Sequence, residues 1–555
     1  MRFIMKRMFT RKLSVLLSAL MVIGSLTLAP VSAADAPQET AAQSYGLPDS
    51  IEDGAILHAW CWSFNTIKEK LPQIAEAGYK SVQTSPINEV IKGENGGMQL
   101  YGKGKWYYQY QPISYNIGNY QLGTLDEFKE MCEEADKYGI KIIVDIVANH
   151  CSSNYSAISN AVKSLSGGAF HSRVEITDWK NRYQVTQGKL TGLYDLNTQN
   201  PVVQQMIHDY MDACLEAGAD GFRFDAAKHI ELPDEPPVNG VDFSSNFWNV
   251  ILDNDAEFQY GEVLAGDNLD VSQYAKLMKI TASAFGEQLR SGLSRNRITA
   301  SLAKNLRVTG VDNSDLVTWV ESHDNYADGT YSTIDDQMVR QGWALIAAQG
   351  DSTPLFFSRP AGSSTTNQWG KNTIGIAGND NYFHPEVAEV NKFRNAMVGE
   401  DKTVTDITKN TSVLIQRGNK GAVIVNVATT PEVINTDVKL ADGEYTDQVT
   451  GDSFTVKGGK LKGTVGAGAV AVIYIPEEKE TESVIGDIDG DRKVTINDAT
   501  ALQRHLAEYK NEDGSFIVDE SNPAAFEIAD YDLDKRITIF DATAIQKYLA
   551  EFKQG

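Results

Sequence analysis

The stretch Gly218–His229, GADGFRFDAAKH, decides the fold. After a turn signal, Phe222 and Phe224 fall on one face of an alternating run, and Arg223 and Asp225 fall on the other. This alternation predicts a short buried strand that ends in a carboxylate. In a barrel of parallel strands the C-terminal strand ends carry the active site, so Asp225 is placed to meet a substrate. A buried Arg–Asp ion pair is the alternative for this stretch alone.

Three other polar segments follow predicted strands at intervals that suit one barrel: DIVANH at Asp145–His150, GEVL at Gly261–Leu264 and VESHDN at Val320–Asn325. In this order, the four segments resemble those of the α-amylase family of retaining glycoside hydrolases. The chain is similar to the bacterial saccharifying members of that family from about residue 51 to residue 475. The resemblance implies a catalytic (β/α)8 TIM barrel.

Alternating strand and helix patterns also predict this barrel, because parallel strands need crossover connections and eight strands close around a filled interior. Helices are expected at Ile67–Ala77 and Leu125–Tyr138. The eight expected strands are Gly54–Trp60, Tyr79–Thr84, Lys141–Asp145, Phe222–Asp225, Phe258–Val263, Thr281–Phe285, Leu316–Glu321 and Thr353–Phe357.

A chain of 555 residues is too long to fold around a single hydrophobic core, so its length predicts several domains. Ser-, Asn- and Gly-rich composition after the third strand indicates an inserted subdomain, and alternating strands replace helix signals near the end of the barrel region. We expect a signal peptide at 1–34, the barrel at 51–400 with its insertion at about 151–198, an antiparallel β-sandwich at 401–475, a charged linker at 476–484 and an all-α calcium-binding module at 485–555.

Residues 1–34 have the three parts of an export signal. Basic residues precede the apolar run Leu13–Leu28, and Val31–Ala33 supplies a small-residue cleavage pattern. An uncleaved anchor is the alternative, although no second long apolar run follows. We therefore expect a secreted, extracellular protein whose mature form does not insert into a membrane.

The formal net charge of −24 disfavours nucleic acid as a partner and is compatible with a neutral polysaccharide. The four cysteines are scattered without metal-ligand spacing, and three of them lie in predicted core elements. Buried thiols are therefore expected rather than a disulfide framework. Cys151 directly follows His150, but the surrounding carboxylates argue against a thiol nucleophile.

Retaining glycoside hydrolysis needs a carboxylate nucleophile and a carboxylic acid about 5 to 5.5 Å apart. Asp225 and Glu262 end neighbouring predicted strands and suit that spacing. The resemblance implies that Asp225 is the nucleophile, that Glu262 is the acid/base, and that Asp324 stabilises the transition state. We expect Arg223 to keep Asp225 ionised, whereas Glu262 needs a raised pKa to hold its proton.

The resemblance also implies substrate contacts. Tyr110 and Gln111, within the aromatic run that includes Tyr107, match a platform for the sugar at the cleavage point. Core packing is the alternative for Tyr107. His150 and His323 match hydroxyl-binding histidines, and the leaving-group side is matched by Lys228 and His229.

A structural calcium site is implied by the resemblance, with ligands from the side chains of Asn149 and Asp195 and from the backbone carbonyls of Thr186 and His229. All-oxygen ligation fits Ca²⁺. A simple turn residue is the alternative for Asp195.

The last segment is an internal duplication, since DIDGDRKVTIND at Asp487–Asp498 recurs as DYDLDKRITIFD at Asp530–Asp541, each before a matching amphipathic helix. Two twelve-residue calcium loops are predicted. The pair resembles the type I dockerin module, which implies a cohesin partner on a scaffold. A solvated acidic tail is the alternative. The expected ligands are Asp487, Asp489, Asp491, Lys493, Thr495 and Asp498 in the first loop, and Asp530, Asp532, Asp534, Arg536, Thr538 and Asp541 in the second.

These inferences predict a secreted enzyme that hydrolyses internal α-1,4 bonds of starch and related α-glucans with retention, that holds one structural and two dockerin Ca²⁺ ions, and that attaches to a cell-surface scaffold. A related enzyme acting on α-1,6 bonds, a transglycosylase, and a non-catalytic starch-binding protein are the alternatives. The presence of all three carboxylates argues against the last of these.

Overall fold

The computed structural model describes residues 44–93, 96–172, 175–266, 269–306, 308–476, 485–489, 494–511, 515–520 and 522–552, with residues 523, 524, 551 and 552 described by backbone only. The predicted signal peptide, nearly all of the predicted linker, and the expected calcium ligands Asp491 and Lys493 lie outside these ranges.

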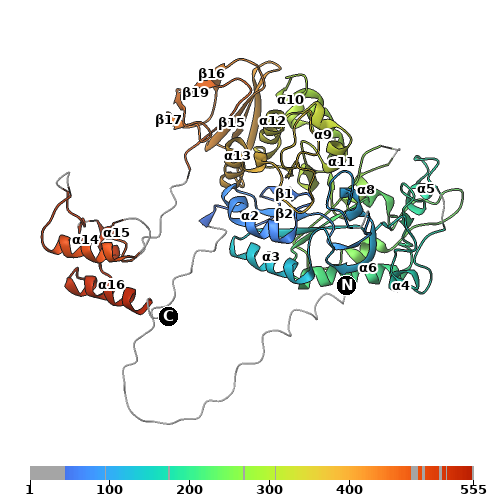
Figure 1. The fold of residues 1–555 in the computed structure, drawn as a ribbon. Helices are drawn as coiled ribbons and strands as arrows, with labels where there is room; N and C mark the ends of the chain where they lie inside the picture. The colour runs from blue at the N-terminus through green and yellow to red at the C-terminus, as the bar shows by residue number, and fades with distance from the viewer. Residues whose placement is uncertain are drawn as a thin grey trace, which may run out of the picture.

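Eight parallel strands close into a barrel, which confirms the predicted fold class (Figure 1). Their order around the barrel is β1-β12-β11-β10-β9-β8-β5-β2. The strand that decides the fold, β8, pairs with β5 at Arg223↔Asp145 and with β9 at Arg223↔Tyr260. The bounds are β1 (Ile56–Ala59), β2 (Ser81–Thr84), β5 (Lys141–Ile146), β8 (Gly221–Phe224), β9 (Phe258–Gly261), β10 (Lys279–Thr281), β11 (Leu316–Thr318) and β12 (Thr353–Phe357).

The sixth strand differs from its prediction. The range Thr281–Phe285 is wrong, because β10 ends at Thr281 and α9 (Ser283–Leu293) begins two residues later. Phe285, Leu289 and Leu293 are buried at a four-residue spacing, which is the period of a helix. Over a few residues, the first apolar side chains of that helix resemble the end of a strand.

Helices surround the barrel strands. Thr124 caps α3 in a capping box with Glu127, and Gly139 takes a left-handed conformation (φ 67°) just beyond its end, which turns the chain into β5. The helices of this region are α2 (Phe64–Glu76), α3 (Leu125–Lys137), α6 (Pro201–Glu216), α7 (Phe247–Ile251), α8 (Ser272–Ala275), α9, α10 (Ala300–Lys304), α11 (His323–Ala327), α12 (Asp336–Ala347) and α13 (Pro385–Ala396), with short 3-10 helices η1 (Trp106–Tyr110), η2 (Ala227–His229), η3 (Asn313–Asp315), η4 (Thr330–Ser332) and η5 (Asp380–Phe383).

Two excursions border the C-terminal face of the barrel. One holds the hairpin β3 (Asn88–Val90) and β4 (Pro112–Ile117) together with η1. The other lies between β5 and α6 and contains β6 (His150–Cys151), α4 (Asn160–Lys163), α5 (Arg182–Gln187) and β7 (Tyr194–Asp195). The strands β6 and β7 pair antiparallel, so the second excursion is tied back to the end of β5.

After α13 the chain forms two four-stranded antiparallel sheets, β13-β14-β15-β20 and β16-β19-β18-β17. The first sheet faces α12 and α13 of the barrel region (Figure 1). A separate apolar core that includes Leu414, Ile424, Phe454 and Ile473 lies between the sheets. The bounds are β13 (Lys402–Thr408), β14 (Ser412–Arg417), β15 (Gly421–Asn426), β16 (Glu432–Asp437), β17 (Gly443–Thr446), β18 (Ser453–Lys457), β19 (Lys460–Val465) and β20 (Val470–Tyr474).

The C-terminal region contains α14 (Ile496–Leu506), α15 (Pro523–Ala529) and α16 (Ile539–Phe552). A small core that includes Ala499, Leu502, Ala542 and Ile545 joins α14 to α16. Equivalent positions of the two repeats therefore pack against each other, which agrees with the internal duplication.

All four cysteines are buried free thiols, as expected. Burial raises the pKa of the Cys151 thiol to about 12, so this side chain is protonated and unsuited to nucleophilic attack. Within the described ranges, no helix has both the length and the apolar character needed to cross a bilayer.

Candidate active site

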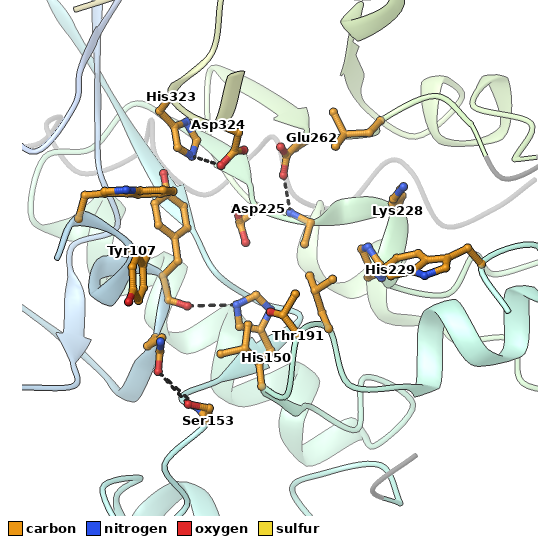
Figure 2. A pocket seen from close by; sticks show the side chains of 18 residues that line it. Tyr107, His150, Ser153, Thr191, Asp225, Lys228, His229, Glu262, His323 and Asp324 are labelled. Carbon is orange, nitrogen blue, oxygen red and sulfur yellow. Dashed lines mark hydrogen bonds and ion pairs between the residues drawn. The ribbon is translucent and has the colours of Figure 1, made fainter. Parts of the chain in front are cut away.

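The predicted catalytic carboxyls meet in one cavity at the C-terminal face of the barrel (Figure 2). Asp225 directly follows β8, Glu262 directly follows β9, and Asp324 lies in the first turn of α11. Asp324 is the most accessible, with a side chain 45% exposed against 11% for Asp225 and 14% for Glu262. Three separate segments of the chain thus supply one carboxyl each to the same cavity.

Arg223 links the buried carboxyls. Its Nη1 donates to Asp225 Oδ1 at 2.7 Å and to Asp145 Oδ1 at 2.8 Å, and its Nη2 lies 3.0 Å from Glu262 Oε2. The N–H donors of a guanidinium lie in one plane and point in fixed directions, so one arginine can bind all three carboxyls. A lysine ammonium lacks this planar set of donors.

The backbone between the two candidate catalytic residues is also fixed. Ala226, next to Asp225, adopts a left-handed conformation with φ 49° and ψ 34°. Its N–H donates to Glu262 Oε2 at 3.0 Å. Strain in a non-glycine residue is typical of functional sites, and here it aims a backbone donor at a candidate catalytic carboxyl.

Arg223 acts on both candidate catalytic carboxyls. Burial raises the pKa of Glu262, the nearby Asp225 charge raises it further, and Arg223 lowers it. Burial also raises the pKa of Asp225, against the lowering effect of Arg223. Arg223 therefore acts on Asp225 in the expected direction, but burial is the largest effect and leaves the pKa of Asp225 raised, because one guanidinium is shared among three carboxyls. Ionisation of Asp225 through Arg223 stays a prediction.

Asp145 is a site residue to which the sequence analysis gave no role. It is fully buried, it accepts from Arg223, and its Oδ2 accepts from the hydroxyl of Tyr110 at 2.9 Å. Burial raises the pKa of Asp145, and Arg223 opposes that rise. Its position near the C-terminal end of β5 was a usable signal, because side chains from that end of a barrel strand approach the active site.

The predicted aromatic platform lines one side of the cavity. The rings of Tyr110 and His323 stack with centroids 5.2 Å apart and planes 9° from parallel. His150 Nε2 donates to the Tyr110 carbonyl at 3.1 Å, and Gln111 Oε1 accepts from Ser152 at 3.0 Å. Tyr107 remains 39% exposed at the cavity, which argues against core packing for this residue.

The candidate substrate-binding histidines are neutral. Burial lowers the pKa of His150 to about 4 and lowers the pKa of His323 well below its usual range. A neutral imidazole has one donor and one acceptor. In this structure His150 uses them on the Tyr110 carbonyl and on the side-chain amide of Asn149, 3.3 Å away, so sugar binding by His150 stays a prediction.

Lys228 and His229 lie across the cavity from Tyr107, with Asp225 and Glu262 between them (Figure 2). The ammonium of Lys228 lies 6.0 Å from the ring centroid of Trp179, which comes from the second excursion and is 42% exposed. Several further residues line the cavity and could not be found from the sequence, because no local pattern marks them: Trp179, Leu190, Thr191, Leu193 and Leu264.

The residues expected to hold the structural calcium come from adjoining segments. β6 pairs with β7 so that His150 faces Asp195, which brings the preceding Asn149 close to Asp195. Thr186 lies in α5 and His229 in η2, and these helices contact each other through His229 Nδ1, which donates to the Val185 carbonyl at 2.9 Å.

The chemistry of this region fits a cation. Asp195 is buried, and its Oδ2 is bonded to His171 Nδ1 at 2.6 Å, while its Oδ1 has no hydrogen-bond partner among the described residues. Burial and the nearby Glu231 raise the pKa of Asp195 well above its usual range. An unsatisfied buried carboxylate oxygen is costly unless a cation binds it.

The repeat loops of the C-terminal region also gather carboxylates. Oxygens of Asp487, Asp489 and Asp498 lie within 4.8 Å of one another, and so do those of Asp530, Asp532 and Asp541. These residues hold positions 1, 3 and 12 of each predicted loop. Two equivalent clusters at equivalent places support the prediction of two calcium loops.

Three of the remaining expected ligands make hydrogen bonds within their loops. Thr495 Oγ1 donates to Asp498 Oδ2 at 3.0 Å, and Thr538 Oγ1 donates to Asp541 Oδ2 at 3.3 Å. Asp534 donates its N–H to Asp530 Oδ1 at 3.0 Å. Ligation by Thr495, Thr538, Asp534 and Arg536 stays a prediction.

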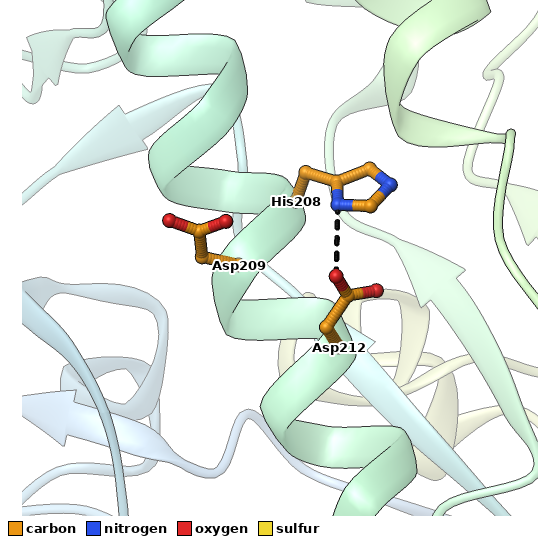
Figure 3. Close-up of side chains that lie close together, drawn as sticks. All are labelled: His208, Asp209 and Asp212. Atoms are coloured by element: carbon orange, nitrogen blue, oxygen red, sulfur yellow. Dashed lines mark ion pairs between the residues drawn. The ribbon is translucent and has the colours of Figure 1, made fainter.

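A third group, His208, Asp209 and Asp212, lies on the surface of α6 (Figure 3). His208 Nδ1 pairs with Asp212 Oδ2 at 3.1 Å, one turn further along the helix, and its Nε2 lies 3.2 Å from the Asp253 carbonyl. Both ring nitrogens therefore face oxygen atoms of the protein, and we do not assign this group as a metal site.

Comparison with known proteins finds matches to two families. Residues 47–282 match the family described as alpha amylase, catalytic domain, and residues 485–550 match the family described as dockerin type I domain. An alpha-amylase of Butyrivibrio fibrisolvens is 42% identical over 488 residues, covering 80% of this chain and 49% of the relative. An alpha-amylase of Clostridium acetobutylicum is 38% identical over 440 residues, covering 77% of this chain and 55% of the relative. The chain thus spans about half the length of these curated relatives.

Solved structures show the same fold. Wild-type alpha-amylase I from Eisenia fetida superposes with a TM-score of 0.63 at 21% identity, covering 77% of this chain and 98% of that one. The alpha-amylase from Geobacillus thermoleovorans superposes with a TM-score of 0.58 at 17% identity, covering 77% of this chain and 99% of that one.

Proposed function

We propose that this chain, which carries a catalytic domain of the α-amylase family of glycoside hydrolases and a type I dockerin domain, hydrolyses internal α-1,4 bonds of starch and related α-glucans with retention of configuration. The observation that supports this most directly is the shared guanidinium of Arg223, which binds the candidate nucleophile Asp225 and the candidate acid Glu262 at one cavity.

In the proposed reaction, Glu262 gives its proton to the glycosidic oxygen while Asp225 attacks the anomeric carbon and the bond to the leaving sugar breaks. A covalent glycosyl–Asp225 intermediate forms. Water then attacks that carbon, Glu262 takes the water proton, and the bond to Asp225 breaks. Two inversions at one carbon give net retention.

The other residues of the cavity bind and orient the sugar. We infer that Asp324 accepts hydrogen bonds from the hydroxyls of the sugar at the cleavage point, and that His150 and His323 form hydrogen bonds with the hydroxyls of the same sugar. Tyr110 covers its apolar face, since aromatic planes bury such surface at low entropic cost. Lys228 and His229 contact the leaving-group side.

The barrel calcium would be held by Asn149, Asp195 and the carbonyls of Thr186 and His229. When bound, the ion neutralises a buried carboxylate and takes no part in bond cleavage. Asn149 directly precedes His150. Binding of the ion to Asn149 would therefore hold His150, and with it one wall of the cavity, in place.

We further propose that the two repeat loops each bind one Ca²⁺ ion and that the C-terminal domain attaches the enzyme to a cohesin module of an extracellular, cell-surface scaffold. The match to the dockerin family and the paired carboxylate clusters support this attachment.

The product profile on soluble amylose and pullulan tests the proposed catalytic function. We expect short α-1,4 oligosaccharides from amylose, with the α configuration at the new reducing end in proton NMR during the first turnovers, and little release from the α-1,6 bonds of pullulan. Initial β products would overturn the roles of Asp225 and Glu262. Cleavage restricted to α-1,6 bonds would assign a different substrate, and the absence of any products would favour a binding protein.

A further inference from the structure

An aromatic pair, Tyr101 and Trp369, lies next to the catalytic cavity but outside its lining residues; Tyr101 is exposed and Trp369 is half-buried. The rings of Tyr101 and Trp369 stack with centroids 5.5 Å apart and planes 7° from parallel. Tyr101 nevertheless remains 66% exposed, whereas large aromatic side chains are usually well covered. The pair therefore presents a flat apolar surface to solvent.

This pair is continuous with the aromatic wall of the cavity. The ring of Trp369 lies 6.5 Å from that of Trp60, and Trp60 lies 5.5 Å from Trp106, which lines the cavity beside Tyr107. Trp60 is only 3% exposed, so it supports the surface from below. An aromatic surface thus runs from the cavity wall to Tyr101.

Hydrogen bonds hold the two loops that carry the pair. Asn372 accepts from the Tyr101 N–H at Oδ1 and donates from Nδ2 to the Tyr101 carbonyl, both at 2.8 Å. Gln368 Nε2 donates to the carbonyls of Tyr326 and Ala327 at 2.8 and 2.9 Å. Both of these acceptors belong to α11, the helix that carries Asp324, so the position of the pair is fixed relative to the catalytic centre.

We propose that Tyr101 and Trp369 form an additional subsite that binds glucosyl units of an α-glucan chain remote from the cleavage point. Sugar rings present an apolar face that an aromatic plane can cover. Tyr107 lies opposite Lys228 and His229 in Figure 2, on the side away from the leaving group. The pair continues the wall on the Tyr107 side and therefore binds the part of the chain toward its non-reducing end.

The proposed subsite rests on the proposed α-glucan specificity. It adds a preference for longer glucan chains. A short oligosaccharide fills the cavity without reaching Tyr101, whereas a longer one covers both. The subsite therefore selects for long chains and leaves the reaction at Asp225 and Glu262 unchanged.

The experiment uses the full chain with Glu262→Gln, which blocks turnover, and measures the Kd of maltoheptaose and maltotriose by calorimetry. We expect the further change Tyr101→Ala to weaken maltoheptaose binding about fivefold and to leave maltotriose binding unchanged. Trp369→Ala should act in the same direction. Tyr509→Ala is the matched control, because Tyr509 is 60% exposed but belongs to the C-terminal region.

Equal affinity of the Tyr101→Ala and parent proteins for maltoheptaose would overturn the subsite while leaving the proposed function in place. Equal weakening for both sugars would also overturn it, because the effect would then belong to the cavity. If the parent bound neither sugar, the proposed function itself would fail and the subsite with it. Since Tyr101 is exposed, its variant decides the question even where Trp369→Ala disturbs the loop.

Discussion

Arg223 Nη2 lies 3.0 Å from Glu262 Oε2, while the Nη1 of the same guanidinium donates to Asp225 at 2.7 Å. One cation therefore lowers the pKa of both the candidate acid and the candidate nucleophile. Arg223 alone therefore does not separate the two pKa values. The charge of Asp225 raises the pKa of Glu262, and we expect this coupling to keep the proton on Glu262.

Replacing Arg223 by lysine should keep the positive charge and lose the planar geometry. We expect kcat to fall by about a hundredfold or more, since a small misplacement of catalytic groups has an effect of that order. Steady-state kinetics on soluble amylose, with circular dichroism to check folding, measures this change. Near-normal turnover by Arg223→Lys would mean that the bidentate geometry is unnecessary.

Asp225→Asn and Glu262→Gln should each lower turnover on amylose by about 10³-fold or more. They should differ on α-maltosyl fluoride, whose leaving group needs no protonation. Formation of the covalent intermediate should be restored in Glu262→Gln and absent in Asp225→Asn. Mass spectrometry of the trapped protein distinguishes the two, and rescue of Asp225→Asn instead would reverse the assigned roles.

The pH profile should reflect the raised pKa of Glu262. Because the acid must carry a proton, kcat/KM should fall as the pH rises through a value above 4.5, the ordinary pKa of a glutamate. The charge of Asp225 raises the pKa of Glu262, so Asp225→Asn should lower it. Infrared titration of the carboxyl band in both proteins measures the shift. An unchanged or higher pKa in Asp225→Asn contradicts the coupling.

The barrel strands and the catalytic carboxyls at their ends could be predicted because patterns of neighbouring residues mark both. Phe222 and Phe224 alternate with Arg223 and Asp225, and a strand end places the last of these at the active-site face. Helix α9 shows the limit of this reasoning. Its first apolar turn looks like the end of a strand over a few residues, and only the spacing of Phe285, Leu289 and Leu293 reveals the helix.

The relations between strands were less accessible from the sequence. Arg223 of β8 contacts both Asp145 and Glu262. These contacts exist only because β5 and β9 both pair with β8. The unsatisfied oxygen of Asp195 likewise depends on the packing of His171 from a distant part of the excursion. Both features depend on contacts between residues far apart in the sequence, and no local sequence pattern predicts such contacts.

Asp195→Asn should have opposite effects with and without calcium. With Ca²⁺ present, the variant loses a charged ligand, and the catalytic region should melt at a lower temperature. With chelator present, the wild-type carboxylate is buried with an unsatisfied oxygen, a situation that costs about 1–3 kcal/mol. The neutral amide should then be as stable as wild type or more stable. Calorimetry of both full-length proteins measures the crossing, and a deficit of the variant that is equal in both conditions argues against a metal at Asp195.

Asp498 and Asp541 should determine calcium binding in the C-terminal domain because each joins a loop to the helix that follows. Asp498 Oδ1 accepts from the N–H groups of Ile488 and Asp489 at 2.7 and 3.1 Å, and its Oδ2 accepts from Thr495 N at 2.6 Å. Asp541 repeats this pattern, with its Oδ1 3.1 Å from Asp532 N and its Oδ2 2.7 Å from Thr538 N. An amide in this place keeps one acceptor oxygen, turns the other into a donor and removes the charge.

Asp498→Asn and Asp541→Asn should therefore each remove one tight calcium site from the full chain, and the double variant should remove two and lose cohesin binding. Glu508→Gln is the control, because Glu508 is exposed and lies outside both loops. Calorimetric calcium titration counts the sites, and a surface-bound cohesin module measures attachment. Hydrolysis of amylose should continue in all four proteins, since the barrel carries its own calcium ligands. A double variant that still bound calcium with the wild-type stoichiometry would show that the paired loops are not the binding sites.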